Sequence, residues 1–276
     1  MKNSSSFLLA DLKKVPPFPA VAARLLNLLS NQEISTAEVA GLISSDAALT
    51  ARVLQHVNSP VYGLRSTVTD IRQAVGLLGF DRTRQVTVMI ATAGYAQQAL
   101  RNVELQSCWK HSLATAVLAS EIAKGCEAFT KIVFTASILH DIGRLGLMIA
   151  YPRHYTEAIR SAPGYLDLLD FEREEFGIDH AEAGRLLIEA WKLPAEFGVI
   201  AGRHHDPCEG SELDLLQIIH VACQLADILG FCVVPPRGGG DVRAILDKLP
   251  AGAGQHLQGT PEELRVQVEH HISKVI

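Results

Sequence analysis

Cysteine is scarce in this sequence, and no two cysteines form a CxxC pair. The five cysteines are dispersed among the 276 residues, at Cys108, Cys126, Cys208, Cys223 and Cys232. A disulfide framework or a zinc ribbon needs paired, regularly spaced cysteines, so the sequence predicts neither. The thiols are expected to be reduced, as in a cytoplasmic protein.

Long uncharged apolar runs are also missing. No stretch approaches the roughly 18–20 uncharged apolar residues that a membrane-spanning helix needs. The apolar stretch within Met1–Lys14 is too short for a signal peptide and lacks a small-residue cleavage site. A formal net charge of −5, from 25 basic and 30 acidic residues, argues against a protein that coats nucleic acid or an anionic membrane. We therefore expect a cytoplasmic protein with no membrane partner.

Strand-like alternation is absent beyond a few residues, and apolar residues recur at helical spacing instead. A core stripe is predicted for the helix over 21–29, and Ser35 with Glu38 predicts the capped start of the next helix. Further helices are expected from Ser107 to Gly125 and from Thr130 to about residue 142, with Gly143 closing the latter. Helices are also expected from Asp179, from Pro194 to His205, over 213–229 and from Thr260. The composition, 48% hydrophobic and 20% charged, is that of a globular protein, and the fold class expected is all-α.

Histidine is the informative residue type. His111 lies on an apolar helical stripe, His140-Asp141 follows the apolar pair Ile138-Leu139, His180 begins a capped helix, and His204-His205 end another. Imidazoles with a carboxylate suit iron, manganese, nickel or zinc, and bundle cores assemble metal sites from several helices. The alternative is that each is an ordinary buried histidine with a satisfied hydrogen bond, which is the commoner case for any one of them.

Six other histidines carry no such signal and are interpreted as ordinary residues. They are His56, His154, His220, His256, His270 and His271.

Several segments, taken in order, resemble one known family. The N-terminal ones are Val15-Pro16-Pro17-Phe18-Pro19-Ala20, Leu42-Ile43-Ser44-Ser45-Asp46, Leu49-Thr50-Ala51-Arg52-Val53-Leu54, Val57-Asn58-Ser59 and Ile71-Arg72-Gln73-Ala74. The later ones are Trp109-Lys110-His111-Ser112, Leu139-His140-Asp141-Ile142-Gly143, His180-Ala181-Glu182-Ala183-Gly184 and His204-His205-Asp206-Pro207. From about residue 15 to residue 230 the chain resembles the HDOD domain, a bacterial signalling module related to the HD phosphohydrolases.

The resemblance implies an HD-like helical bundle preceded by a helical subdomain. It divides the chain into an N-terminal subdomain over 1–100 and a metal-site bundle over 101–232. The proline- and glycine-rich stretch over 233–240 and the capped start at Thr260 predict a linker with a C-terminal helix over 233–276. The resemblance also implies one or two divalent transition-metal ions, iron, manganese, nickel or zinc, with Asp141 bridging. The ligands it implies are His111, His140, Asp141, His180, His204 and His205.

Three departures from the related enzymes stand out. Cys223 occupies the place of a late aspartate ligand, and Asp227, one helical turn on, is an alternative. Arg144 replaces a lysine, and arginine cannot donate a proton near neutral pH. The Gly-Tyr-Pro stretch of the cyclic dinucleotide phosphodiesterases is missing after His205.

Two functions follow as hypotheses. One is a signal-transduction module with little or no catalysis, whose partner is a signalling protein or a phosphorylated small molecule. The other is a metal-dependent phosphohydrolase of a nucleotide, cyclic dinucleotide or other phosphoester, in which Asp141 and Arg144 would serve catalysis. Nucleic-acid binding through Arg65, Arg72, Arg82 and Arg84 is a weaker alternative, because a solvated helix face explains these arginines and no recognised motif accompanies them.

Overall fold

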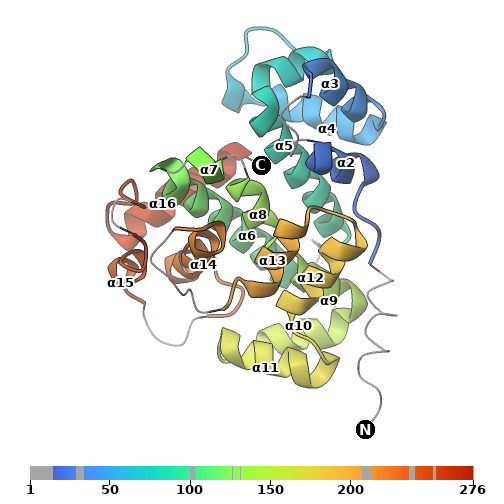
Figure 1. Ribbon diagram of the computed structural model, residues 1–276. Helices are drawn as coiled ribbons and strands as arrows, with labels where there is room; N and C mark the ends of the chain where they lie inside the picture. The colour runs from blue at the N-terminus through green and yellow to red at the C-terminus, as the bar shows by residue number, and fades with distance from the viewer. Residues whose placement is uncertain are drawn as a thin grey trace.

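Helices build the whole of the described structure, in which no β-strand is present (Figure 1). It is a computed structural model. It describes residues 15–28, 34–99, 103–125, 127–130, 132–206, 213–235, 240–250 and 253–275. The all-α fold class predicted from the sequence is confirmed.

The N-terminal helices enclose a small hydrophobic core of their own, at the top of Figure 1. They are α2 (Ala20–Leu28), α3 (Thr36–Ser44), α4 (Ala47–Val57), the 3₁₀ turn η1 (Pro60–Tyr62) and the first part of α5 (Ile71–Ala99). The predicted start of α3 is confirmed: Ser35 Oγ accepts from the Glu38 amide, and the Glu38 carboxylate accepts from the Ser35 amide at 2.8 Å. Helix α2 buries Ala22, Leu25 and Leu26 along its apolar stripe.

Helix α5 connects this core with a second, larger one. Val75 packs in the N-terminal core, and Met89 packs in the second. The helix is interrupted at Gly79, where φ is 71° and ψ is 172°, a conformation that residues with a Cβ rarely adopt. The two hydrophobic cores are therefore joined by one helical element with a fixed bend.

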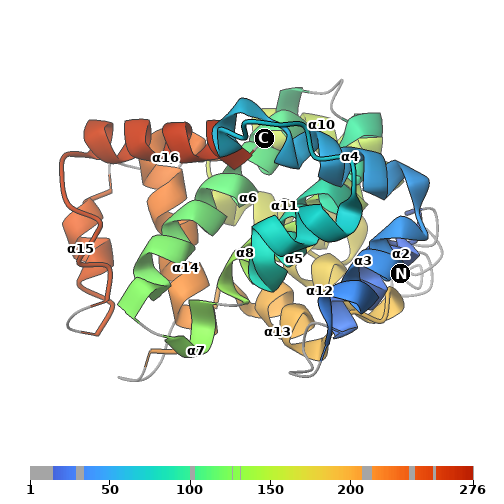
Figure 2. The same cartoon turned by 90° about the horizontal axis from the view of Figure 1, so that it is seen from above.

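The second core is built around α6, α8 and α14, with α9, α12 and α13 packed beside them (Figure 1 and Figure 2). Its elements are α6 (Val103–Ile122), η2 (Ala123–Gly125), α7 (Glu127–Thr130), α8 (Val133–Leu139), α9 (Ile142–Ala150), α10 (Pro152–Ser161), α11 (Tyr165–Phe176), α12 (His180–Ala190), α13 (Ala195–Arg203) and α14 (Leu215–Ala226).

The C-terminal part continues from α14 through the π-turn η3 (Asp227–Phe231) to α15 (Val242–Leu246) and α16 (Pro261–Val275). Helix α16 packs against α6 and η3, and Thr260 and Glu263 form a capping pair at its start. Within the segment 233–259, expected to be a linker, Ile245, Leu249 and Leu257 are buried in the second core. Residues 236–239 and 251–252 of that segment lie outside the described residues.

The division into three parts stays a prediction. Its expected boundary, near residues 95–107, includes residues 100–102, which lie outside the described residues.

Two helix boundaries predicted from the sequence are wrong. Helix α6 begins at Val103 rather than after Ser107. The single helix expected from Thr130 to about residue 142 is broken into α8 and α9 at His140-Asp141, and Gly143 lies inside α9 instead of closing a helix. Asp141 has φ −102° and ψ 17°, which is outside the α-helical region, and this break turns its side chain out of the helical register.

One stretch, Val133–Ala150, is long and apolar enough to meet the criteria for a membrane span. It holds the ionisable residues His140, Asp141 and Arg144, and 89% of it is buried inside the protein. The stretch is therefore part of the second hydrophobic core. The cytoplasmic location stays a prediction.

Helices α9 and α12 approach each other closely at Gly143. A Cβ placed on Gly143 would lie 1.8 Å from the His180 carbonyl oxygen and 2.5 Å from the Gly184 amide nitrogen. No side chain fits there, so the glycine sets the distance between the helix that follows Asp141 and the helix that begins at His180.

Replacing Gly143 by alanine is therefore expected to force the two backbones apart. Overpacking of this kind costs about 2–3 kcal/mol, so the melting temperature of Gly143→Ala should fall by roughly 5–10 °C. Differential scanning calorimetry measures the change. Gly41→Ala is the control, because a Cβ on this α3 glycine meets nothing within 4 Å; it should leave the protein as stable or slightly more stable. Equal melting of Gly143→Ala and wild type would contradict the packing described.

Candidate metal centre

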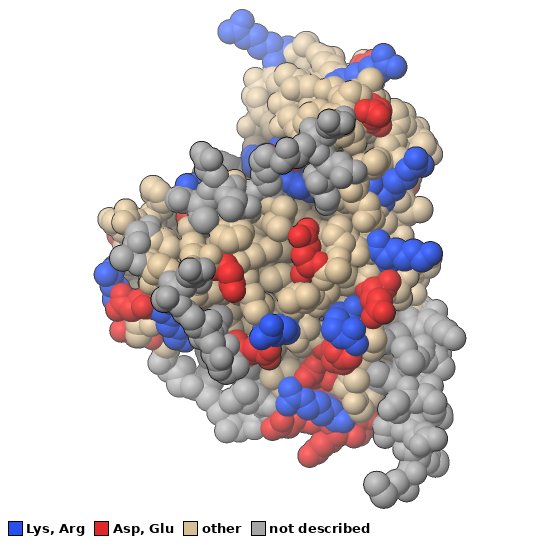
Figure 3. Space-filling model, in the orientation of Figure 1, with Lys and Arg blue, Asp and Glu red and all other residues tan. Residues whose placement is uncertain are grey.

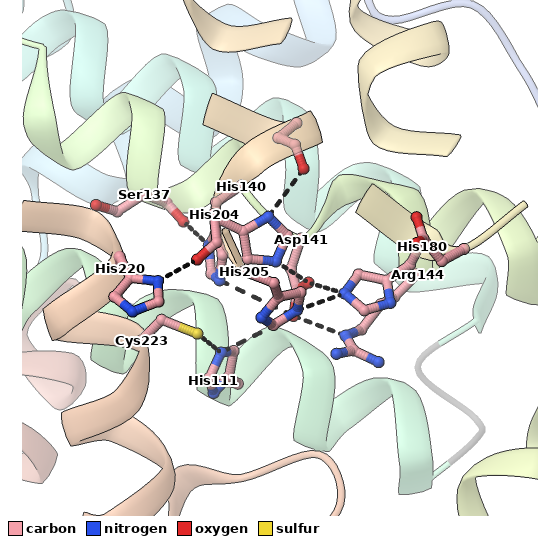
Figure 4. A network of polar contacts seen from close by, with 12 residues as sticks. His111, Ser137, His140, Asp141, Arg144, His180, His204, His205, His220 and Cys223 are labelled. Carbon is pink, nitrogen blue, oxygen red and sulfur yellow. Dashed lines mark hydrogen bonds and ion pairs between the residues drawn. The ribbon is translucent and has the colours of Figure 1, made fainter. Parts of the chain in front are cut away.

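The structure brings all six predicted ligand residues to one place in the second core (Figure 4). They come from four regions of the chain: His111 from the middle of α6, His140 and Asp141 from the break between α8 and α9, His180 from the start of α12, and His204 and His205 from the end of α13. His140 is 0% and Asp141 4% exposed. Their function as metal ligands stays a prediction.

Local signals fix two of these positions. Asp179 is the N-cap of α12 and accepts from the Glu182 amide, which makes His180 the first helical residue. His204 follows α13 directly as its C-cap, where the negative end of the helix dipole favours a cation. Both placements were predicted from the sequence and are confirmed.

The two oxygens of Asp141 face two different groups of imidazoles. Oδ1 lies 3.3 Å from His180 Nε2 and 3.4 Å from His204 Nε2. Oδ2 lies 3.9 Å from both His111 Nε2 and His140 Nε2. A carboxylate placed between two sets of nitrogens in this way has the geometry of a bridging ligand.

Outer hydrogen bonds orient four of the rings with Nε2 toward the centre. The Nδ1 atoms of His111, His140 and His204 lie 3.1, 2.5 and 2.8 Å from the carbonyl oxygens of Phe231, Ser137 and Ala201. The Nδ1 atom of His180 lies 2.7 Å from a Glu172 carboxylate oxygen. Since carbonyls and carboxylates only accept, each Nδ1 carries the hydrogen, and each Nε2 presents a lone pair inward. This is the arrangement found in metal-binding histidines.

Three buried acceptors at the centre lack any hydrogen-bond donor among the described residues. They are His140 Nε2, His204 Nε2 and Asp141 Oδ1. Leaving such groups unsatisfied costs about 1–3 kcal/mol each, and bound divalent cations would satisfy them. The residues present therefore fit a metal, and the donor set of imidazoles with one carboxylate suits a transition metal better than magnesium or calcium.

Arg144 is the main positive charge of the centre. Its Nε donates to Asp141 Oδ2 at 2.8 Å, and its Nη1 lies 3.4 Å from Tyr155 Oη and 3.7 Å from Glu172 Oε1. Burial by itself would raise the pKa of Asp141, but Arg144 and the neighbouring histidines outweigh it and hold that pKa well below its usual range. Asp141 is thus a carboxylate whose charge is partly balanced by arginine.

Glu172 was not identified from the sequence, although it is fully buried beside the centre. It accepts from the amide and the ring of His180 and from Tyr155 Oη at 2.7 Å. Burial opposes its ionisation, but His180 and Arg144 lower its pKa. One signal was available: Glu172 falls at helical spacing between Leu168 and Phe176, so a carboxylate interrupts an apolar stripe.

The residues that could supply a late ligand lie on opposite sides of the His111 ring. Cys223 Sγ is 3.4 Å from His111 Nε2, the inward nitrogen. Asp227 Oδ1 is 3.3 Å from Nδ1, the outward one. His220 remains outside the centre, where its Nδ1 donates to the His204 carbonyl oxygen at 2.8 Å.

Comparison with known proteins identifies related sequences and folds. Residues 15–207 match the HDOD domain family. An HDOD domain protein of unknown function from Geobacter sulfurreducens has a TM-score of 0.72 at 20% identity, over 98% of this chain and 96% of that one. A candidate signal transduction protein from Marinobacter aquaeolei VT8 has a TM-score of 0.72 at 19% identity, over 99% and 64%. A candidate metal-dependent phosphohydrolase from Shewanella amazonensis SB2B has a TM-score of 0.60 at 21% identity, over 100% of both chains.

These structural likenesses establish the fold. Among curated proteins, an uncharacterised protein of Treponema pallidum is 28% identical over 199 residues, which are 70% of this chain. The aligned region spans 38% of that relative's length.

The metal-free protein is expected to lose stability as the pH falls below about 6.5. Burial, together with the neighbouring histidines and against the opposing effect of Asp141, lowers the pKa of His140 and of His205 well below 6.5. Between those values and 6.5 the unfolded chain binds more protons than the folded one, so stability declines with falling pH, by at most about 1.4 kcal/mol per pH unit for each histidine. Chemical denaturation from pH 7.5 to 5 in the presence of a chelator measures the slope.

Matched variants separate the buried histidines from exposed ones. His205→Asn should make this slope shallower, and His154→Gln, at an exposed position of α10, should leave it unchanged. A pH-independent stability of the metal-free protein between 7 and 5.5 would contradict burial of neutral imidazoles.

Proposed function

Because the chain belongs to the HDOD domain family, we propose that it is a regulatory module of bacterial signal transduction. In this proposal it binds one or two divalent transition-metal ions and has little or no catalytic activity. The proposed metal binding rests on one observation: the buried acceptors at and around Asp141 have no hydrogen-bond donor among the described residues. When bound, such an ion would act as a Lewis acid on a water or phosphate oxygen.

The state of Arg144 supports the weak or absent catalysis. Arginine serves catalysis in a phosphohydrolase when it is free to contact the phosphoryl group and stabilise its charge, as metal ions also do. Here the guanidinium is 4% exposed and engaged with Asp141, Tyr155 and Glu172. If Arg144 moved onto a substrate, the buried carboxylates of Asp141 and Glu172 would lose their cationic partner. Breaking a buried ion pair in this way costs about 3–5 kcal/mol of stability.

A protein partner fits the surface better than nucleic acid. On the face drawn in Figure 3, basic and acidic side chains are interspersed over a mostly uncharged surface. Of the four N-terminal arginines weighed for nucleic-acid binding, Arg84 is 5% exposed and pairs with Asp81 at 2.8 Å, so the four do not present one basic face. The similarity to a candidate signal transduction protein supports a signalling protein as the partner. A phosphorylated small molecule is the other ligand class in this proposal.

The second candidate function is a metal-dependent phosphohydrolase. The placement of Asp141 between two groups of imidazoles favours it, because two bridged metals are a common centre for phosphoester hydrolysis. The similarity to a candidate metal-dependent phosphohydrolase supports it as well.

Metal content and turnover of one preparation discriminate these functions. Protein purified without added metal or chelator should contain one to two equivalents of transition metal by elemental analysis. It should hydrolyse bis(4-nitrophenyl) phosphate no faster than its Asp141→Ala variant. That variant should lose the metal, and with it a stabilisation of about 3 kcal/mol, so its melting temperature should fall by roughly 5–10 °C. His154→Ala is the control and should retain both.

Two results would overturn the proposal in different ways. Wild-type protein without metal, with Asp141→Ala melting unchanged, would leave the histidines as core residues. Turnover by the metal-loaded wild type that Asp141→Ala abolishes would establish the phosphohydrolase instead.

A further inference from the structure

A thiol lies beside the imidazoles on one side of Asp141. One potential ligand atom from each of His111, His140 and Cys223 lies within 4.8 Å of the others, and all three residues are buried. A second group of the same kind, Asp141 with His180, His204 and His205, lies next to it. Residues 15–207 match the HDOD family, so Cys223 comes from outside the matched region.

We propose that the centre holds two ions of different ligand chemistry, and that Cys223 binds one of them as a thiolate with His111, His140 and Oδ2 of Asp141. The other ion belongs to the group of His180, His204 and His205 with Oδ1 of Asp141. This inference rests on the metal binding proposed above and adds a ligand and a metal preference to it.

The orientation of the Asp141 carboxylate supports the division. Its Oδ2 atom faces His111 and His140, the two imidazoles that are grouped with Cys223. His140 Nε2 has no hydrogen-bond donor in the described structure, and its residue is 0% exposed. The pocket beside Cys223 therefore contains an unsatisfied, inward-facing nitrogen of its own.

The contact between Cys223 and His111 is suited to exchange of a proton for a metal. His111 donates from Nδ1 to the Phe231 carbonyl, so Nε2 accepts, and the Cys223 S–H is the donor at 3.4 Å. In this contact the sulfur therefore carries its proton. When a divalent ion enters, the thiol proton leaves to solvent, and sulfur and Nε2 both become ligands.

Asp227 is excluded from this pocket by its position. Its carboxylate lies on the Nδ1 side of His111, away from Asp141, and there it positions the ring rather than the ion. The fourth donor beside His111, His140 and Asp141 is therefore sulfur.

The donor sets imply different metals. A thiolate with two imidazoles and one carboxylate oxygen selects zinc, iron(II) or cobalt(II) and discriminates against magnesium and manganese. The pocket of three imidazoles and one carboxylate oxygen has only nitrogen and oxygen donors and accepts a wider range of ions.

Cobalt(II) reports on sulfur ligation directly. The full chain, freed of metal by a chelator and titrated with cobalt(II), should bind two ions and develop the intense near-ultraviolet charge-transfer absorption that a thiolate gives and imidazole or carboxylate does not. Cys223→Ser should lose this absorption and bind one ion fewer. Cys223→Asp, which restores an oxygen ligand, should bind two ions without the absorption. Cys108→Ser is the matched control, since Cys108 is also buried but is not in either ligand group; it should behave like wild type.

The outcomes separate this inference from the proposed function. Two bound cobalt ions without charge-transfer absorption in wild type, or absorption that persists in Cys223→Asp, would overturn the thiolate ligand and leave metal binding intact. Failure of wild type to bind any cobalt would overturn both.

Discussion

The buried Asp141 carboxylate is the group on which the organisation of the second core depends. A charge in this position is costly to desolvate. The chain gives it one direct cationic partner, Arg144, while the four imidazole nitrogens that point inward present lone pairs to the same space. Arg144 gives only partial relief, because Oδ1 has no donor in the described structure. The core is thus arranged around a negative charge that a cation would complete.

A network of ion pairs and hydrogen bonds extends outward from Asp141. Arg144 reaches Glu172 and Tyr155, and Glu172 in turn fixes His180 through both its amide and its ring. A single network therefore connects α9, α10, α11 and α12, so the side chains that orient the centre also hold these helices together. Loss of any one member leaves another buried charge without a partner, which is why such networks respond to substitution as units.

The fold class and several helix starts could be predicted from the sequence, because each depends on local chemistry. The set of six clustered residues was implied by the resemblance to the HDOD domain. Ser35 with Glu38 and Asp179 with Glu182 are capping pairs within one helical turn. The position of His180 follows from the second pair, because Asp179 is the N-cap of the helix that His180 begins. The break at His140-Asp141 could not be predicted, since the apolar pattern continues through it and only packing against α12 shows its purpose. Glu172 was missed because its partners lie on other helices, and the side of His111 that Cys223 occupies depends on the tertiary arrangement of α6 and α14.

The clustered residues are widely separated along the chain, and this separation has a consequence for biosynthesis. His111 and His205 are 94 positions apart, which a ribosome translates in about 5–20 s. During that interval the earlier imidazoles belong to an incomplete core, and the nascent chain has no enclosed pocket to retain an ion. The proposed ligand set is complete only after α13 and α14 have been made and have docked, so in this proposal an ion would be acquired late in the synthesis of the second core.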